Sequence, residues 1–300
     1  MRVRGLRLHV AVAGPEHGRP VMLVHGWPQH WYEWRHLLGP LAQAGFRAIA
    51  PDLRGFGWSE YPPDEDFRKE TLVDDLIDLC GALGHERVAY VGHDWGCWAG
   101  WLLCLRRPDL VERAVLLSVR PPFPPDRIEP AGLARLARLA YQLPLAAPLP
   151  PRLKLSALGL MRNLGGNPPE DAEVYAANLA QPSQLRATTL LYRQFLTREL
   201  GPLIAGRYAG ERLTVPVRFL VGDQDFLFEE EMVDEAAAHT DAEYRGDVLA
   251  ASGLRVDYTV LIPDRVRAGY VDTTAELGHY LEICQLQKAD IEFFTGLVEA

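Results

Sequence analysis

The stretch that most constrains the fold of this chain is residues 89–96, Ala-Tyr-Val-Gly-His-Asp-Trp-Gly. Its apolar beginning leads directly into a Gly-x-Asp-x-Gly pentapeptide, and an apolar run with several small residues follows at 97–105. This order predicts a strand, a sharp turn and a helix in immediate succession. Gly92 and Gly96 permit the close backbone approach of such a strained turn, which directs the side chain of Asp94 out of the sheet edge.

The carboxylate at the centre of this turn points to a particular kind of chemistry. In the related turn Gly-x-Ser-x-Gly the central serine must lose a proton before it attacks. Asp94 is already ionised at neutral pH, helped by the free N–H groups and the dipole of the helix N-terminus. Attack by a carboxylate on an acyl carbon gives an unstable anhydride, whereas attack on a saturated carbon gives an ester that water later hydrolyses. We therefore expect displacement at an sp3 carbon; the alternative is an ordinary N-cap or turn aspartate.

Length and charge limit the classes of partner. The 300 residues suit two domains or one large domain with an insertion. A net charge of −9 without a long basic run argues against nucleic acid or an anionic membrane as partner. The first residues alternate like strands and lack the apolar core of a signal peptide, and no run reaches the ~18 apolar residues of a membrane span. We therefore expect a soluble, cytoplasmic protein.

The cysteines give no sign of a metal site. They lie in apolar contexts, and neither a CxxC pair nor a suitable histidine spacing accompanies them. Buried, reduced thiols are the expected state. The sequence thus predicts neither a metal nor another cofactor.

Strand and helix patterns alternate along most of the chain. The apolar segments 20–24, 46–50, 114–118 and 215–221 are typical of buried strands, and 72–83 places leucines on one helical face. Such alternation predicts an α/β fold, with a mainly parallel sheet that carries helices on both faces.

The alternation is interrupted between 120 and 212. Several prolines follow Arg120, and beyond them only helical patterns and proline-rich joints occur. We predict a helical cap at 120–212, inserted into a core made of 1–119 and 213–300. A second, smaller insertion is predicted at 241–263 because the stretch around it is longer than a helix, a strand and their loops require; it would provide a lid or a dimer contact.

Two loops at strand ends carry further candidates. His25-Gly26-Trp27-Pro28 follows the strand 20–24, and Gly26 lets the N–H of Trp27 point at a developing negative charge; a plain Gly-Pro turn is the alternative. His25 itself is expected to support this loop. In the loop after the strand 46–50, Asp52 and Arg54 are expected to form an ion pair that orders the loop.

An acid and a histidine follow late in the chain. Asp225 comes directly after the strand 215–221, at an edge where an acid can orient a histidine. His279 follows a glycine near the end of the chain. Asp94, Asp225 and His279 therefore occur in the order nucleophile, acid, histidine, which is the order of the α/β-hydrolase fold.

The chain resembles that superfamily over nearly its full length. More narrowly, the His-Gly-Trp-Pro loop, the turn around Asp94, Gly222-x-x-Asp225 and Gly278-His279 are similar to those of the epoxide hydrolases, whose close relatives are the haloalkane dehalogenases. The resemblance implies an α/β-hydrolase fold with a helical cap. It also implies a small, apolar epoxide and water as substrates. A homodimer is one possible assembly.

The resemblance implies roles for the matching residues. Asp94 would open the epoxide to a hydroxyalkyl ester, and His279, oriented by Asp225, would activate the water that hydrolyses it. The N–H groups of Trp27 and Trp95 would hold the ester oxyanion.

An epoxide oxygen leaves as a basic alkoxide, so it needs an acid, and the family places two tyrosines on the cap for this purpose. Tyr141 matches the first in its distance after the nucleophile and its Tyr-Gln context. Tyr192 matches the second through Leu-Leu-Tyr-Arg, against the family's Asn-Tyr-Tyr-Arg. For both tyrosines, packing within an amphipathic cap helix is the alternative.

Two other functions remain open on the sequence. A haloalkane dehalogenase would use the same scaffold, although Trp27 stands where many dehalogenases have a halide-binding asparagine. A non-catalytic receptor for small molecules would keep the pocket, but a pocket used only for binding has no need of Asp94, Asp225 and His279 together.

Overall fold

The computed structural model of the chain describes residues 1–123, 139–149, 169–222, 225 and 235–249. His279 and Cys284 lie outside the described residues, as does the greater part of the predicted insertion at 241–263.

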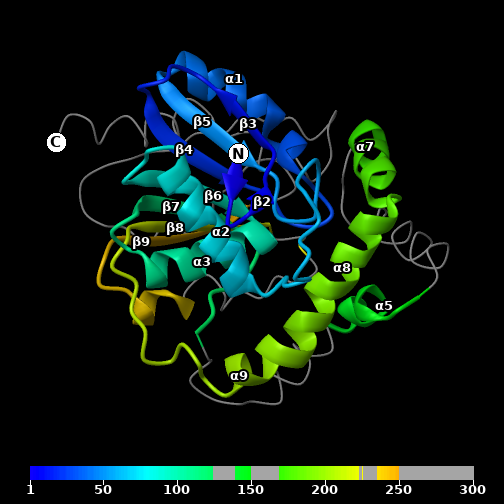
Figure 1. The fold of residues 1–300 in the computed structure, drawn as a ribbon. Coiled ribbons are helices and arrows are strands. Elements are labelled where there is room, and N and C mark those ends of the chain that lie inside the picture. The colour runs from blue at the N-terminus through cyan, green and yellow to red at the C-terminus, as the bar shows by residue number, and fades with distance from the viewer. Residues whose placement is uncertain (124–138, 150–168, 223–224, 226–234, 250–300) are drawn as a thin grey trace.

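A seven-stranded sheet forms the centre of the molecule, in the order β3-β5-β4-β6-β7-β8-β9 (Figure 1). Its strands are β3 (Val10–Ala13), β4 (Arg19–Val24), β5 (Phe46–Pro51), β6 (Val88–His93), β7 (Val111–Leu117), β8 (Val217–Gly222) and β9 (Tyr244–Leu249). All neighbours are parallel except β3, which pairs antiparallel with β5. A separate two-stranded ribbon joins β1 (Arg2–Val3) to β2 (Leu6–Arg7). The prediction of a mainly parallel sheet is confirmed.

Alternate side chains of each strand point to opposite faces of the sheet, and both sets pack in apolar clusters, so both faces are buried. In β4, Met22 and Val24 belong to the apolar cluster that contains helices α2 (Lys69–Ala82) and α3 (Trp95–Arg106). Val21 and Leu23 belong to the cluster on the other face, with α1 (Arg35–Gln43). A short 3₁₀ turn, η1 (Trp31–Trp34), leads into α1. The sheet therefore carries helices on both faces, as predicted.

Strand β7 begins at Val111, earlier than the segment 114–118 predicted from its apolar run. The residues missed are charged in part: Glu112 pairs with Arg19, and Arg113 is buried. A strand whose charged side chains find partners on other elements carries no apolar signal at that end.

The described elements between β7 and β8 are helical. They are η2 (Leu139–Tyr141), α5 (Gln142–Ala146), α7 (Pro169–Leu179), α8 (Pro182–Gln194), the π-helical η3 (Phe195–Glu199) and α9 (Leu200–Ile204). In Figure 1, α5, α7 and α8 lie together beside the sheet, apart from α1, α2 and α3. None of the helices in the described ranges combines the length and apolar character that a membrane crossing requires.

The edge strand β9 falls at the start of the predicted insertion 241–263. It is preceded by a short 3₁₀ turn, η4 (Ala237–His239), and pairs in parallel with β8 along its whole length. This part of the range therefore extends the central sheet.

Candidate active site

The turn between β6 and α3 holds Asp94 in a strained conformation, with φ 50° and ψ −118°. A Cβ added to Gly92 would collide with the carbonyl of Gly96, and one added to Gly96 would collide with the carbonyl of Val24 in the adjacent strand. The Tyr90 hydroxyl donates to the Gly96 carbonyl at 2.7 Å. Backbone thus packs directly on backbone at this turn, which is why both glycines are needed and why Asp94 is displayed at the sheet edge.

The loop after β4 lies against the Asp94 carboxylate. The backbone N–H of Trp27 donates to Asp94 Oδ1 at 2.7 Å. A Cβ on Gly26 would overlap the Asp94 side chain, so this loop approaches the carboxylate as closely as a backbone can. The Trp27 N–H thus points at a negative charge, as predicted. A second N–H reaches the carboxylate from Trp95, the first residue of α3.

Burial disfavours the negative charge of Asp94, whereas its neighbours stabilise that charge. Burial raises the pKa of Asp94 to about 6, against the lowering effects of His93 and of the backbone N–H groups of Trp27 and Trp95. The carboxylate is therefore ionised at neutral pH but is poorly solvated. Such a group is a better nucleophile than a carboxylate in water.

His93, the residue before Asp94, pairs with a buried acid. His93 Nδ1 is 2.7 Å from Glu33 Oε1, and the Glu33 side chain is 2 % exposed. Burial disfavours the charge on His93, but Glu33, and then Asp94, outweigh burial and raise the His93 pKa. Sequence reasoning missed Glu33; its only signal is a single acid between the tryptophans of an otherwise apolar turn.

Tyr192 of α8 packs against the two residues that hold the carboxylate. Its ring lies edge-on to Trp27, with centroids 5.3 Å apart, and edge-on to Trp95 at 5.5 Å. The Trp27 indole N–H also donates to Thr188 Oγ1 on the same helix at 3.0 Å. Helix α8 therefore covers the edge of the sheet at which Asp94 is displayed.

Tyr141 lies beside Tyr192, with ring centroids 6.4 Å apart. Burial raises the pKa of Tyr141, and the negative charge of Asp94 raises it further, followed by a smaller contribution of Asp225. The Gln142 amide donates to the Tyr141 hydroxyl at 3.3 Å. The structure thus brings both sequence-predicted tyrosines to the same side of Asp94 and keeps the Tyr141 hydroxyl protonated.

Asp225 follows β8 at the carboxyl edge of the sheet, where its N–H donates to the Gly222 carbonyl at 3.1 Å. Its charge contributes to the raised pKa of both His93 and Tyr141, so Asp225 faces the same region as Asp94. His279, predicted to be its partner, lies outside the described residues.

The residues around the Trp27 loop have structural roles. His25 Nε2 accepts from the Leu53 N–H at 2.9 Å, which confirms that this histidine supports the loop. The predicted ion pair between Asp52 and Arg54 is wrong. Asp52 accepts backbone N–H bonds from Trp31 and Trp58, whereas Arg54 binds both carboxylate oxygens of Asp75.

The three cysteines in the described part of the chain are buried thiols, as predicted. Cys80, Cys97 and Cys104 are free and buried, and burial raises the pKa of each. Within the described ranges, no group of three or more His, Cys, Asp or Glu side chains is arranged to hold a metal ion.

Comparison with known proteins places this geometry in context. A family model described as "alpha/beta hydrolase fold" matches residues 19–250. The chain is 31% identical to the AB hydrolase superfamily protein YfhM of Bacillus subtilis, over 80% of this chain and 85% of that protein. It is 34% identical to epoxide hydrolase 3 of Siraitia grosvenorii, over 76% of this chain and 81% of that protein. Among solved structures, an epoxide hydrolase from Vigna radiata is 27% identical with a TM-score of 0.67, over 83% of this chain and 90% of that chain.

Proposed function

The chain belongs to the α/β-hydrolase fold family, and within it to the epoxide hydrolases, and from this premise we propose that it opens epoxides to vicinal diols through an ester on Asp94. The observation that carries the proposal is the buried Asp94 carboxylate, held by the Trp27 N–H at 2.7 Å on the side of the sheet where two tyrosines lie. The substrate would lie between the core and the helical cap at 120–212.

In the first step the two carboxylate oxygens have different tasks. Oδ1 accepts the Trp27 N–H, so the second oxygen attacks an epoxide carbon from the side opposite the C–O bond that breaks. The new bond joins this oxygen to carbon, and the bond electrons leave with the epoxide oxygen. The product is a hydroxyalkyl ester of Asp94.

The departing oxygen needs a proton because an alkoxide is too basic to leave as such. Tyr141 and Tyr192 are the proposed acids. The raised pKa of Tyr141 keeps its proton in place before the reaction, while Asp94 is still charged. When Asp94 has become a neutral ester, one cause of the raised pKa is gone and the tyrosinate is easier to form.

In the second step a water molecule adds to the ester carbonyl carbon. His279, oriented by Asp225, takes a proton from the water and passes it to the departing alcohol oxygen. The oxyanion forms on Oδ1, which the Trp27 N–H holds, and the Trp95 N–H reaches the same carboxylate; one such donor is typically worth about 3 kcal/mol. Release of the diol restores the Asp94 carboxylate, and the remaining proton of the water returns to the tyrosinate.

The expected substrate is apolar because the side chains next to Asp94 are aromatic. Trp27, Trp95 and Tyr192 are each no more than 6 % exposed, and both tryptophan rings pack on Tyr192. No metal or organic cofactor takes part in the proposed reaction.

The test incubates the purified protein with styrene oxide and with 1-bromobutane, and scores diol and bromide. Diol from the wild type, none from Asp94→Ala, and an alkyl adduct on Asp94 in the intact mass of His279→Gln are the expected results. Full epoxide hydrolysis by Asp94→Ala would falsify the assignment of the nucleophile. Bromide without diol would instead mean a haloalkane dehalogenase.

A further inference from the structure

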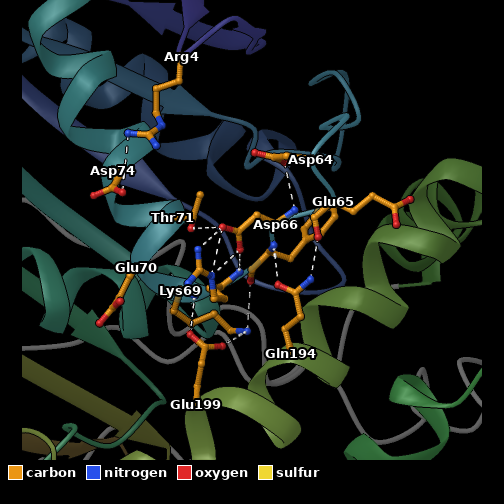
Figure 2. Close-up of polar contacts among 12 residues, drawn as sticks. Arg4, Asp64, Glu65, Asp66, Lys69, Glu70, Thr71, Asp74, Gln194 and Glu199 are labelled. Carbon is orange, nitrogen blue, oxygen red and sulfur yellow. Dashed lines mark hydrogen bonds and ion pairs between the residues drawn. The ribbon is translucent and has the colours of Figure 1, made fainter.

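Lys69 is a cation buried between the core and the cap helices. It is the first residue of α2, and its side chain is 0% exposed (Figure 2). A lysine in the first turn of a helix opposes the helix dipole, and burial of its charge adds a further cost. Its neighbours must therefore compensate for both.

Besides a long contact of Nζ with the Phe67 carbonyl at 3.5 Å, the compensation comes from a segment more than a hundred residues away. Lys69 Nζ donates to the Leu191 carbonyl at 2.8 Å and lies 3.2 Å from Glu199 Oε2. The other oxygen of Glu199 accepts the backbone N–H of Lys69 at 2.7 Å, so one carboxylate serves both the helix N-terminus and the ammonium.

These contacts fall where α8 changes into the π-helical η3. The Leu191 carbonyl already accepts the Phe195 N–H, so the ammonium uses its second lone pair. Leu191 directly precedes Tyr192, one of the proposed acids. The ammonium thus fixes the helical turn that carries this tyrosine.

The same ammonium lies against the wall of the site. Nζ is 4.3 Å from the centroid of the Trp95 ring, within the range of a cation–π interaction, and 5.3 Å from that of Phe195. Trp95 supplies one of the N–H groups at Asp94, and its ring packs on Tyr192. Lys69 therefore contacts both Trp95 and the helical turn that carries Tyr192.

The charges that face this ammonium are carboxylates. Burial lowers the Lys69 pKa, and Glu199, Asp94 and Asp66, in decreasing order, offset that effect. The interaction with Asp94 is mutual, so a charged Lys69 adds to the stability of the ionised form of Asp94, behind the larger effects of His93 and of the Trp27 and Trp95 N–H groups.

We propose that Lys69 is a positioning residue for the reaction, whose ammonium holds Trp95 and the Leu191–Tyr192 turn in register and favours the carboxylate form of Asp94. The inference rests on the proposed function, because it assigns a task to Lys69 in that same chemistry. An apolar side chain would fill the position at less cost in buried charge, so stability alone does not account for the lysine.

The test is Lys69→Met, which keeps the shape of the side chain and removes the charge. We expect kcat for styrene oxide to fall on the order of tenfold at an unchanged KM, because Tyr192 and Trp95 lose their common support. The midpoint of the acidic limb of the pH profile should move to higher pH, because Asp94 loses a nearby cation. If Lys69→Met does not fold, Lys69→Met combined with Glu199→Met removes the pair without leaving a buried charge and should lower kcat at an unchanged KM in the same way, because the support of Trp95 and of the Tyr192 turn is lost.

The matched control is Arg35→Met. Arg35 binds both oxygens of Asp171 at 2.7 and 2.8 Å and so joins α1 to α7, away from Trp95 and Tyr192. This variant should lose stability and keep the wild-type pH profile. A Lys69→Met protein with wild-type kcat and an unmoved midpoint, altered only in melting temperature like the control, would overturn the positioning role. If the wild type itself forms no diol, it is the proposed function that fails.

Discussion

Two regions of the molecule each bury a charge: the turn around Asp94, and the joint that Lys69 forms with Leu191 and Glu199. The groups that compensate the buried charge differ between them. At Asp94 the compensating groups are His93 and two backbone N–H donors, and two of these three groups belong to the residues on either side of Asp94. At Lys69 they are a carboxylate and a helix carbonyl that lie 130 and 122 positions away. The first charge is held by the residues on either side of Asp94 together with the Trp27 loop, the second by docking of distant helices.

This difference separates the reactive group from its support. The backbone N–H groups that hold Asp94 belong to the residues that follow β4 and β6, so they are part of the sheet and its loops. The tyrosines sit on helices whose position depends on polar contacts such as Gln194, which accepts the Phe67 N–H and donates to the Glu65 carbonyl (Figure 2). Changes at the turn should therefore act on the chemical step directly, and changes at the joint should act through Tyr192 and Trp95.

The largest effect is expected where both regions meet, at the tyrosines. Tyr141→Phe combined with Tyr192→Phe should lower kcat for epoxides by about 10²- to 10⁴-fold, the usual contribution of general acid catalysis. Release of bromide from 1-bromobutane, if the wild type shows any, should survive, since a halide leaves without a proton. Single-turnover kinetics should show slower ester formation, and unchanged ester formation would remove the tyrosines from the mechanism.

A smaller loss should follow from one methyl group at the turn. In Gly26→Ala the new Cβ would overlap the Asp94 side chain, so we expect kcat to fall about 10²-fold through displacement of the carboxylate. Gly39→Ala is the control because nothing lies within 4 Å of its added Cβ. Steady-state kinetics of the two proteins should differ, and equal activity would mean that the Trp27 loop shifts without cost.

The pH dependence sharpens the comparison further. Since burial raises the pKa of Asp94 to about 6 and only the carboxylate attacks, kcat/KM should fall about tenfold per pH unit below that value and level off above it. Initial rates at constant ionic strength between about pH 4.5 and 8 measure this limb. A flat profile across this range would show that Asp94 is not the titrating group.

The smallest effect is expected at an exposed ion pair between α8 and the segment that precedes α2. Arg186 pairs with Glu65, but their side chains are 62% and 37% exposed, so water screens the pair. Arg186→Ala should leave the melting temperature within about 2 °C of the wild type and leave kcat unchanged. A loss as large as that of Lys69→Met would mean that this exposed pair, and not the buried ammonium, holds α8 in place.

The sequence was sufficient for features that depend on neighbouring residues. The strand–turn–helix around Asp94, the Trp27 loop and the parallel sheet all follow from short apolar runs and glycines at fixed places, and the structure confirms them. Tyr141 and Tyr192 were found only through resemblance, because a tyrosine in an amphipathic helix carries no signal of its own.

The features that were missed depend on contacts between distant residues. Glu33 lies on a turn far along the chain from His93, and Lys69 reads as an ordinary charged residue at a helix start. The supposed pair of Asp52 with Arg54 was wrong because each is buried against another partner, Arg54 against Asp75 for instance. Proximity in sequence is a poor guide to which buried charges meet.

The distance in sequence between Lys69 and its partners also orders events during synthesis. When residue 69 leaves the ribosome, Leu191 and Glu199 are still to be made. The core strands up to β7 precede them as well, so the ammonium waits in water, where its charge costs nothing. It is buried only after α8 and η3 have been made, so this buried charge can form only late, shortly before β8 and β9 complete the described sheet.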